Sequence, residues 1–255
     1  MRFRPCIDLH EGRVKQIVGS SLGEDQASLR TNFASHLPPA HYAELYRRDN
    51  LVGGHVIMLG SGNQAAAREA LAAWPGGLQV GGGITDANAV SWLEAGASHI
   101  IVTSHVFHDG LLDVDRLTHL RQLVGRQRLV LDLSCRWRRD GYYVVTDRWQ
   151  KFTSLRISSQ VLEELARFCD EFLVHAVDVE GTCTGIDHRL LEVLAKSVPV
   201  PTTYAGGVAG WADLEQIRSS GQGRIDVTIG SALDIFGGTG LCYDEVVAYH
   251  ARQTR

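Results

Sequence analysis

Two aspartates are the residues of this sequence best suited to acid and base chemistry. Asp8 in "CIDL" and Asp132 in "VLDL" each lie at or next to the end of a short apolar run. A carboxylate there is not needed for packing and costs free energy of desolvation. Two carboxylates that face one substrate can divide into a base and an acid when their surroundings separate their pKa values. The alternative is that each aspartate caps a turn or pairs with a nearby arginine.

Two glycine clusters predict two anion sites. Glycines where a strand meets a helix leave backbone N–H groups uncovered, and a side chain would keep a phosphate from reaching them. Either cluster alone is also explained by a tight turn. Because both occur in register, we predict two phosphate cradles that could hold both ends of one bisphosphorylated ligand. The first consists of Gly82, Gly83, Thr103 and Ser104, and the second of Gly206, Gly207, Gly230 and Ser231.

The two halves of the chain repeat these features at nearly one spacing. Asp8 and Asp132 are 124 positions apart, and so are Gly83 and Gly207. Thr103 and Gly230 are 127 positions apart, which requires a three-residue insertion in the loop "SSGQGR". Glycine pairs after strands are common, so chance could explain the glycines but not the aspartates. A duplicated half is the simpler explanation, and it predicts that the paired residues lie across one common opening.

The elements that must position these residues alternate between strand and helix. Short β-branched or aliphatic runs are separated by stretches such as 158–169, whose apolar residues recur three and four positions apart. Eight strands in such an alternation predict a single-domain (β/α)8 TIM barrel over residues 1–255, with half-barrels of about 1–124 and 125–255. An open doubly wound sheet is the alternative. The expected strands are 4–9, 54–59, 78–82, 99–104, 128–134, 171–179, 201–207 and 224–231.

Two longer loops interrupt this regularity. Residues 135–153 follow the fifth strand, and Asp140-Gly141 between an arginine-rich run and "YYVV" predicts a hairpin turn. Residues 10–20 follow the first strand as a shorter counterpart that turns at Gly12. Long loops at this face of a barrel usually serve the active site.

Composition excludes several classes of partner. With 44% hydrophobic residues, 21% charged residues and a net charge of −4, the chain gives no reason to expect nucleic acid or a membrane as partner. No apolar run approaches the roughly 18 residues that span a membrane, and we expect no signal segment and a cytoplasmic protein. The five cysteines show no CxxC pair, which indicates free thiols in a reducing compartment.

The remaining titratable residues do not form a metal motif. The eleven histidines include no HExxH and no pair at metal-ligand spacing, so we predict no metal. His55 and His175, placed near the beginnings of strands, are interpreted as structural. Cys6, two positions before Asp8 and therefore on the same face, is interpreted as a core residue.

Together these segments resemble a known family. "PCIDLHEGRV", "LQVGGGI", "LVLDLS", "YAGGV" and "IGSALDIFGG" are similar, in order and along nearly the whole chain, to the half-barrel-duplicated isomerases of histidine biosynthesis. Within them the chain resembles the phosphoribosylformimino-5-aminoimidazole carboxamide ribotide isomerases of fungi and plants, by "LVLDLSCRWRRDGYYVVTDRWQKFT" and "FLVHAVDVEGTCTGID". The resemblance implies an Amadori rearrangement of a bisphosphorylated aminoaldose to an aminoketose.

The resemblance also implies roles for particular residues. Asp8 would take the C2 proton as general base, and Asp132 would protonate the ring oxygen. Trp149 would stack on the imidazole ring of the substrate, and Asp178 would support the site. No cofactor is implied, and the chain is expected to act as a monomer on a small molecule. The sequence departs from many bacterial members at Thr85, where they have arginine, and at Val177-Asp178, where they have Thr-Asp.

Three related enzymes and one non-enzymatic function fit parts of the pattern. The sister cyclase, supplied with ammonia by a glutaminase, shares the duplication and the aspartates, but "IGSAL" and "YYVVTDRW" favour the isomerase. Phosphoribosylanthranilate isomerase uses a cysteine base on its first strand, for which Cys6 is a candidate, although Asp8 lies nearer the rim. A dual-substrate isomerase active in both pathways would carry the same features, and so would a phosphate-binding barrel without catalytic activity.

Overall fold

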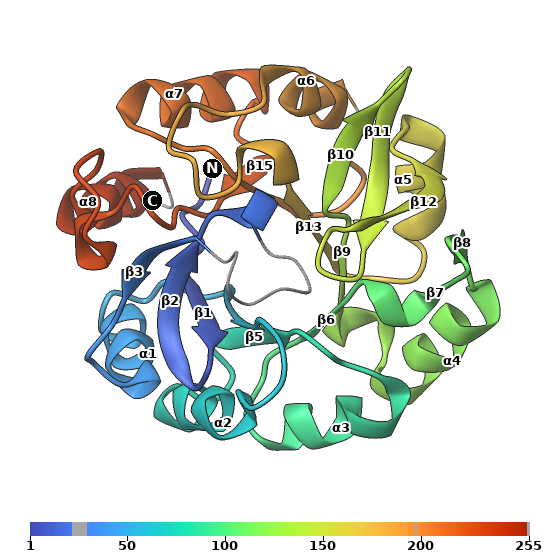
Figure 1. Cartoon of the computed structure of the whole chain (residues 1–255), viewed down its shortest axis with the longest axis horizontal. Coiled ribbons are helices and arrows are strands. Elements are labelled where there is room, and N and C mark those ends of the chain that lie inside the picture. Colours follow the sequence, from blue (N-terminus) through green and yellow to red (C-terminus); the bar gives the residue numbers. More distant parts are fainter. Residues whose placement is uncertain (22–29, 197, 254–255) are drawn as a thin grey trace.

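The computed structural model describes residues 1–21, 30–196 and 198–253, and its centre is a curled sheet of ten strands. Figure 1 shows the strands arranged around a central opening, with helices outside them. The sheet order is β15-β14-β13-β9-β6-β5-β4-β1-β2-β3, and all neighbours from β15 to β1 are parallel. The eight parallel strands are β1 (Cys6–His10), β4 (Gly54–Met58), β5 (Leu78–Gly81), β6 (Ile100–Val102), β9 (Leu129–Asp132), β13 (Glu171–His175), β14 (Thr202–Ala205) and β15 (Ile225–Val227).

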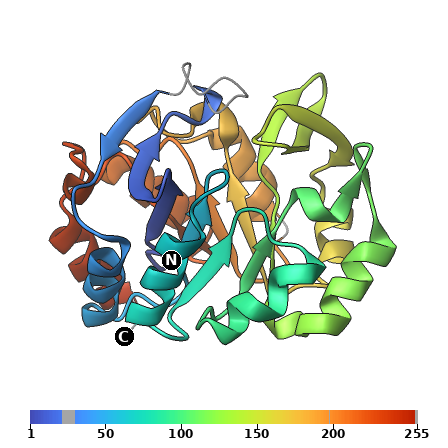
Figure 2. The ribbon, with the colours of Figure 1, turned by 60° about the horizontal axis from the view of Figure 1, so that its bottom comes forward.

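Antiparallel strands extend from one end of this sheet. Beside β1 lie β2 (Arg13–Ile17) and β3 (Thr31–Ala34), and a separate three-stranded sheet follows β9. Figure 2 shows both groups on the same side of the molecule, opposite the side where the termini are marked. The separate sheet consists of β10 (Cys135–Arg138), β11 (Gly141–Thr146) and β12 (Lys151–Arg156), and a two-stranded ribbon is formed by β7 (Phe107–His108) and β8 (Leu111–Leu112).

Eight α-helices in the described part of the chain cover the outside of the sheet (Figure 1). Their starts follow from local chemistry: Pro39 begins the first helix, and the carboxylate of Asp113 accepts a hydrogen bond from the Arg116 N–H at 2.9 Å. No helix among the described residues is long and apolar enough to cross a membrane. The helices are α1 (Pro39–Arg48), α2 (Gln64–Ala73), α3 (Asp86–Glu94), α4 (Val114–Val124), α5 (Ser159–Leu165), α6 (His188–Lys196), α7 (Trp211–Ser220) and α8 (Tyr243–Gln253).

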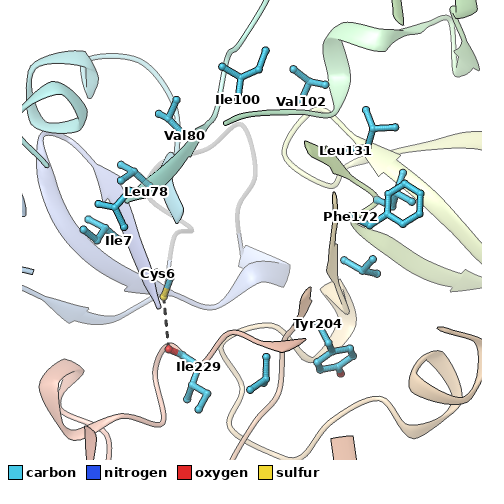
Figure 3. Packing of buried hydrophobic residues seen from close by; sticks show 14 of the residues in the cluster. Cys6, Ile7, Leu78, Val80, Ile100, Val102, Leu131, Phe172, Tyr204 and Ile229 are labelled. Carbon is cyan, nitrogen blue, oxygen red and sulfur yellow. Dashed lines mark hydrogen bonds between the residues drawn. The ribbon is translucent and has the colours of Figure 1, made fainter. Parts of the chain in front are cut away.

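The alternation of side chains along the strands builds two apolar layers. Ile100 and Val102 in β6 belong to the large cluster that faces the helices, whereas Ile101 belongs to a small cluster on the inner side of the curl. Figure 3 shows members of the large cluster pointing away from the centre of the ring. Burial on both faces explains why these strands read as continuous apolar runs. The small inner cluster consists of Ile101, Val130, Leu173 and Ala205, with Ile57 against it.

The last parallel strand meets the segment that precedes the first. Phe3 and Val227 form a parallel bridge, and the Arg4 N–H donates to the Val227 carbonyl at 2.9 Å. The guanidinium of Arg4 is buried inside the curl, 3.0 Å from Asp226 and 3.3 Å from Glu171. Backbone pairing and a buried ion pair therefore both join β15 to the N-terminal segment.

Every expected parallel strand is present; β1 begins later than expected and ends one residue later, and the other seven are shorter. The largest difference is at 224–231, where β15 covers only Ile225–Val227. At 171–179, β13 ends at His175 and a 3₁₀ turn, η5 (Val177–Val179), follows. The turn expected at Asp140-Gly141 lies one residue earlier, because Arg138 pairs with Gly141 and Arg139 takes the left-handed conformation. The strands β2, β3 and β12 were not predicted, because antiparallel strands outside the parallel part of the sheet lack the continuous apolar runs of the buried strands.

Candidate active site

The main cavity opens at the carboxyl ends of the parallel strands and has a volume of about 880 Å³. Asp8 from β1 and Asp132, the last residue of β9, both line it. A smaller cavity adjoins it, and the two share four lining residues: Asp8, Gln16, His175 and Glu180. The polar residues shared by the two cavities therefore mark the centre of one continuous site.

The first predicted cradle lies on the main cavity. Gly82 and Gly83 follow β5 and both have positive φ, +91° and +72°. A Cβ at Gly82 would lie 2.1 Å from the Met58 carbonyl oxygen, whereas a Cβ at Gly83 would meet nothing within 4 Å. Thr103 and Ser104 follow β6 and also line this cavity. The open space at Gly83 is the space that a bound anion would need.

The second predicted cradle lies on the smaller cavity. Gly206 and Gly207 follow β14 with φ of +118° and +75°, and a Cβ at Gly207 would lie 2.2 Å from the Gly185 carbonyl oxygen. Gly230 and Ser231 follow β15 and line the same cavity. All eight predicted cradle residues thus lie at the site, four on each side of its centre.

Asp8 lies in a polar but poorly solvated position. Its Oδ2 accepts a hydrogen bond from Gln16 Nε2 at 3.2 Å, from the neighbouring strand β2. Burial raises the pKa of Asp8 to about 7, with a contribution from the negative charge of Glu180, while His175 and Gln16 oppose the rise. A carboxylate with a pKa near 7 suits a general base, because it is ionised often enough to accept a proton and basic enough to hold it.

The pKa of Asp132 is shifted in the opposite direction from that of Asp8. The Oδ1 of Asp132 accepts hydrogen bonds from the Ser134 N–H at 2.9 Å and the Ser134 hydroxyl at 2.6 Å, and it lies 3.4 Å from His175 Nδ1. Burial alone would raise the pKa of Asp132, but the charge of His175 and these hydrogen bonds outweigh it, so the pKa is lowered. Asp132 is therefore ionised at neutral pH and holds no proton to donate.

Glu180 is a third carboxyl group at the centre of the site. Its Oε2 is buried and has no hydrogen-bond partner among the described residues. Burial raises the pKa of Glu180, and the charge of His175 opposes the rise. A Cβ at Gly206 would lie 3.2 Å from this oxygen, so the unpartnered atom is beside the second cradle.

Trp149 and Asp178 lie in different surroundings. Trp149 lines the main cavity in the left-handed conformation, and its ring centroid is 5.6 Å from that of His175. Asp178 lines neither of these two cavities; its Oδ1 accepts from Arg136 Nε at 2.7 Å. Any support from Asp178 would therefore act through β10, which its partner Arg136 belongs to, and not by contact with a ligand.

Cys6 and His55 are buried and line the smaller cavity. Burial and the charge of Asp8 raise the pKa of the Cys6 thiol well above its ordinary value, so it is not a thiolate at neutral pH. Burial, together with the charge of His175, lowers the pKa of His55 to about 3. Both residues agree with their interpretation as structural.

One group of possible metal ligands exists among the described residues, and it lies elsewhere. His99, Asp170 and Glu171 bring their ligand atoms within 4.8 Å of one another. The carboxylate of Glu171 is already bound by Arg4 and by Gln79 Nε2 at 2.8 Å. Since Glu171 begins β13, this group is at the opposite end of the strand from the cavity.

Sequence reasoning missed three of the four residues shared by the two cavities: Gln16, His175 and Glu180. The sequence pattern suggests a structural role for His175 near the beginning of a strand, but the residue ends β13 and lines both cavities. A strand end at His175 would have been a usable signal, because functional side chains in such folds follow the carboxyl ends of strands. Glu180 follows an irregular turn and gave no comparable signal.

The fold and the site define a class: an α/β protein with two glycine cradles and a cluster of acidic residues and histidine at the carboxyl ends of parallel strands. The chain belongs to the histidine biosynthesis protein family, whose model matches residues 2–238. It is 56% identical over 259 residues to a Medicago truncatula protein, covering 99% of this chain and 83% of that one. It is 51% identical to a Neurospora crassa protein and 42% to one of Saccharomyces cerevisiae, with 99% of each chain covered in both cases.

These three relatives carry the same activity in their names. Each is called 1-(5-phosphoribosyl)-5-((5-phosphoribosylamino)methylideneamino)imidazole-4-carboxamide isomerase, and the Medicago truncatula protein is also named as chloroplastic. The family resemblance expected from the sequence is thereby confirmed.

Proposed function

We propose that this protein is the aldose–ketose isomerase of histidine biosynthesis that its relatives are named for. It would convert the bisphosphorylated aminoaldose ProFAR into the aminoketose PRFAR by an Amadori rearrangement. The observation that carries the proposal is the arrangement of the site, in which one acidic cluster separates two glycine cradles. The names of the relatives support the same substrate, since they describe two phosphoribosyl groups.

The two cradles would hold the two phosphates. Gly82, Gly83, Thr103 and Ser104 would bind one, and Gly206, Gly207, Gly230 and Ser231 the other. Backbone N–H groups freed by left-handed glycines suit such a role. Anchoring both ends would place the aminated ribose beside Asp8 and Asp132, and Trp149 would stack on the imidazole ring from the main cavity.

The chemistry needs only proton transfers. Asp8 would remove the C2 proton as general base, and the side of the site formed by Asp132 would supply the proton that opens the sugar ring. The unpartnered oxygen of Glu180 would hydrogen-bond a substrate hydroxyl. Asp178 would act indirectly, by fixing β10 through Arg136. No cofactor is required.

The architecture proposed for this function is one closed (β/α)8 barrel over residues 1–255, formed by half-barrels of about 1–124 and 125–255. The pairing of Phe3 with Val227 supports closure, and the cradles after β5–β6 and β14–β15 support the duplication. We propose that the chain acts as a monomer. The five cysteines are unpaired, which supports a reducing compartment such as the cytoplasm.

Turnover of the purified protein tests the proposal. The absorbance change on conversion of the aminoaldose, without ammonia or a partner subunit, is the expected result. Asp8→Asn and Asp132→Asn should each abolish turnover while keeping the dissociation constant for substrate within about tenfold. Asp109→Asn, an exposed position outside the site, is the matched control. Normal turnover by both site variants would refute the assignment of the two aspartates.

Different functions of this fold predict different products. The sister cyclase would consume the aminoketose in the presence of ammonia, and a dual-substrate enzyme would also isomerise phosphoribosylanthranilate. The raised pKa of Cys6 argues against a thiolate base in the latter reaction. A non-catalytic binder would bind the aminoaldose without converting it.

A further inference from the structure

His175 has a defined hydrogen-bonding state at one ring nitrogen. The Ser134 hydroxyl has one hydrogen, and it donates this hydrogen to Asp132 Oδ1 at 2.6 Å. The contact between the same hydroxyl and His175 Nδ1, at 3.1 Å, can then form only if Nδ1 carries a hydrogen. Since Asp132 Oδ1 also lies 3.4 Å from Nδ1, the Nδ1–H donates to both groups. The Nδ1 of His175 is therefore fully occupied by its hydrogen bonds to Asp132 and Ser134.

The other ring nitrogen is left for the cavity. Within the part of the chain that the structure describes, Nε2 makes no hydrogen bond, and His175 lines both the main and the smaller cavity. The rings of Trp149 and His55 pack at 5.6 Å and 6.2 Å from the imidazole and fix its plane. Because His175 lines both cavities, a ligand that spans the two cradles would pass beside its imidazole.

The charges around the imidazole favour its protonated form. Asp132 faces it from β9, Asp8 from β1 and Glu180 from the segment after β13, while His55 in β4 stays neutral. Burial alone would lower the pKa of His175, but the three carboxyl groups outweigh burial, with Asp132 first, and raise it to about 9. His175 therefore carries a transferable proton throughout the neutral range, whereas Asp132 carries none.

We propose that His175 Nε2–H donates the proton that opens the sugar ring, and that Asp132 and Ser134 are positioning residues that hold the imidazolium. This inference rests on the proposed isomerase function and assigns one of its two proton transfers. The arrangement parallels other sites in which an ionised aspartate orients a histidine and stabilises its cation. It also explains why two aspartates of the repeat have opposite pKa shifts.

The proton balance closes without another reactant. His175 gives its proton to the ring oxygen as the bond from that oxygen to C1 breaks, and the nitrogen lone pair forms a C1=N bond. Asp8 removes the C2 proton, and the electrons of that bond form an enaminol. The protonated Asp8 then returns its proton to C1, and the neutral His175 accepts the proton of the C2 hydroxyl as the ketone forms. Two protons enter and two leave the substrate, so Asp8 and His175 return to their starting states.

His175→Asn is the direct test, because the asparagine amide can keep the donor to Asp132 and Ser134 while the Nε2 position is lost. We expect kcat to fall about 10²–10⁴-fold, as for loss of a general acid, with KM changed less than about tenfold. The fall of kcat/KM above about pH 9 in the wild type should be absent from the residual activity. His108→Asn, an exposed histidine outside the site, should leave both quantities unchanged.

A second measurement on the wild-type protein does not depend on a variant that folds. An NMR titration of His175 should give a pKa well above the ordinary 6.5 that falls in Asp132→Asn. The proposal is overturned if His175→Asn keeps full turnover and the alkaline limb, or if the titration gives a pKa at or below 6.5. In that case, loss of turnover in Asp8→Asn would leave the isomerase function standing. If the wild type does not convert the aminoaldose, the isomerase function fails, and this role of His175 fails with it.

Discussion

Asp8 and Asp132 show that partners, and not residue type, decide what a carboxyl group does. Both are held in a poorly solvated site, which by itself disfavours ionisation. Asp8 receives one hydrogen bond from a neutral amide and faces Glu180, so its pKa stays raised. Asp132 receives two from Ser134 and faces a cation, so its pKa is lowered. The two aspartates end short apolar runs 124 positions apart in the sequence, and the partners around them make the two carboxyl groups different.

The pH dependence of turnover follows from the base. If Asp8 must be ionised to act, kcat/KM should rise with pH and level off above about 7, the value to which its pKa is raised. Gln16→Leu removes the hydrogen bond that lowers this pKa, so the rise should move to higher pH. A pH–rate profile of wild type and variant measures both. An unmoved rise in Gln16→Leu would show that another group controls it.

The same pKa has a consequence for stability. The folded state holds the Asp8 proton up to about pH 7, whereas the unfolded chain loses it near the ordinary value of 3.8. Between these values the folded protein binds more protons, so the contribution of this group to stability falls as pH rises. Asp8→Asn should therefore have a higher Tm than wild type at pH 8, with the difference shrinking toward pH 4. Thermal melts at pH 4, 6 and 8 test this, and Asp109→Asn should show no such trend.

At the scale of elements, the two neighbouring glycines of the first cradle have different roles: Gly82 allows close packing against β4, and Gly83 leaves space for a ligand. Gly82→Ala would place a methyl group 2.1 Å from the Met58 carbonyl oxygen, so the strand must shift and the protein should be strongly destabilised. Gly83→Ala meets no atom within 4 Å and has only the strain of a left-handed residue, about 1–2 kcal/mol. Gly83→Ala should fold and show a raised KM, because its methyl group fills the space of the phosphate. Calorimetry and kinetics measure the two effects, and equal KM for Gly83→Ala and wild type would count against the cradle.

The three-stranded sheet β10–β12 is attached to the rest of the molecule near η5 by Asp178. In its ion pair with Arg136, the Arg136 side chain is 37% exposed and the Asp178 side chain 41% exposed. Loss of this pair should therefore change the free energy of unfolding by less than about 1 kcal/mol. Asp178→Ala should instead speed amide exchange over residues 135–156 and raise KM, because Trp149 lies between β11 and β12.

Asp140→Ala is the matched control for this attachment. It breaks a pair with Arg156 that lies within the same small sheet and makes no link to η5. Equal exchange over 135–156 in both variants would mean that the Asp178 pair does not hold the sheet. Hydrogen exchange measured by mass spectrometry resolves the segment.

Sequence reasoning succeeded where one pattern determines one structure. Continuous apolar runs predicted all eight parallel strands, and glycine clusters predicted which turns line the two cavities, because buried strands and left-handed turns each admit few residue types. His175 was missed because no local rule marks the residue at which β13 ends, and only that end makes it functional. Glu180 and the Asp132–Ser134–His175 contacts depend on how separate segments meet, which periodicity does not encode.

At the scale of the whole molecule, one buried cation connects parts of the sheet that are far apart in sequence. Arg4 lies within the curl with its side chain only 3% exposed. Its guanidinium contacts Asp226 in β15 and Glu171 in β13, and its Nη1 donates to the Gly53 carbonyl before β4. Its backbone N–H pairs with Val227. The cavity at the other end needs the strands held in this curl, so Arg4 positions the site from a distance.

Removing this cation should have a large effect, because it leaves buried Glu171 without its cationic partner and leaves buried Asp226 with only the half-exposed Arg2. Arg4→Met should cost about 3–5 kcal/mol and lower Tm by roughly 10 °C or more. Arg2→Met is the control, because Arg2 also pairs with Asp226 at 3.0 Å but its side chain is 46% exposed, so its loss should cost less than about 1 kcal/mol. Adding Asp226→Asn and Glu171→Gln to Arg4→Met should restore part of the lost Tm, since neutral groups are easier to bury than unpaired charges. Thermal melts of the four proteins measure this, and equal losses in the two arginine variants would mean that the curl does not depend on the buried network.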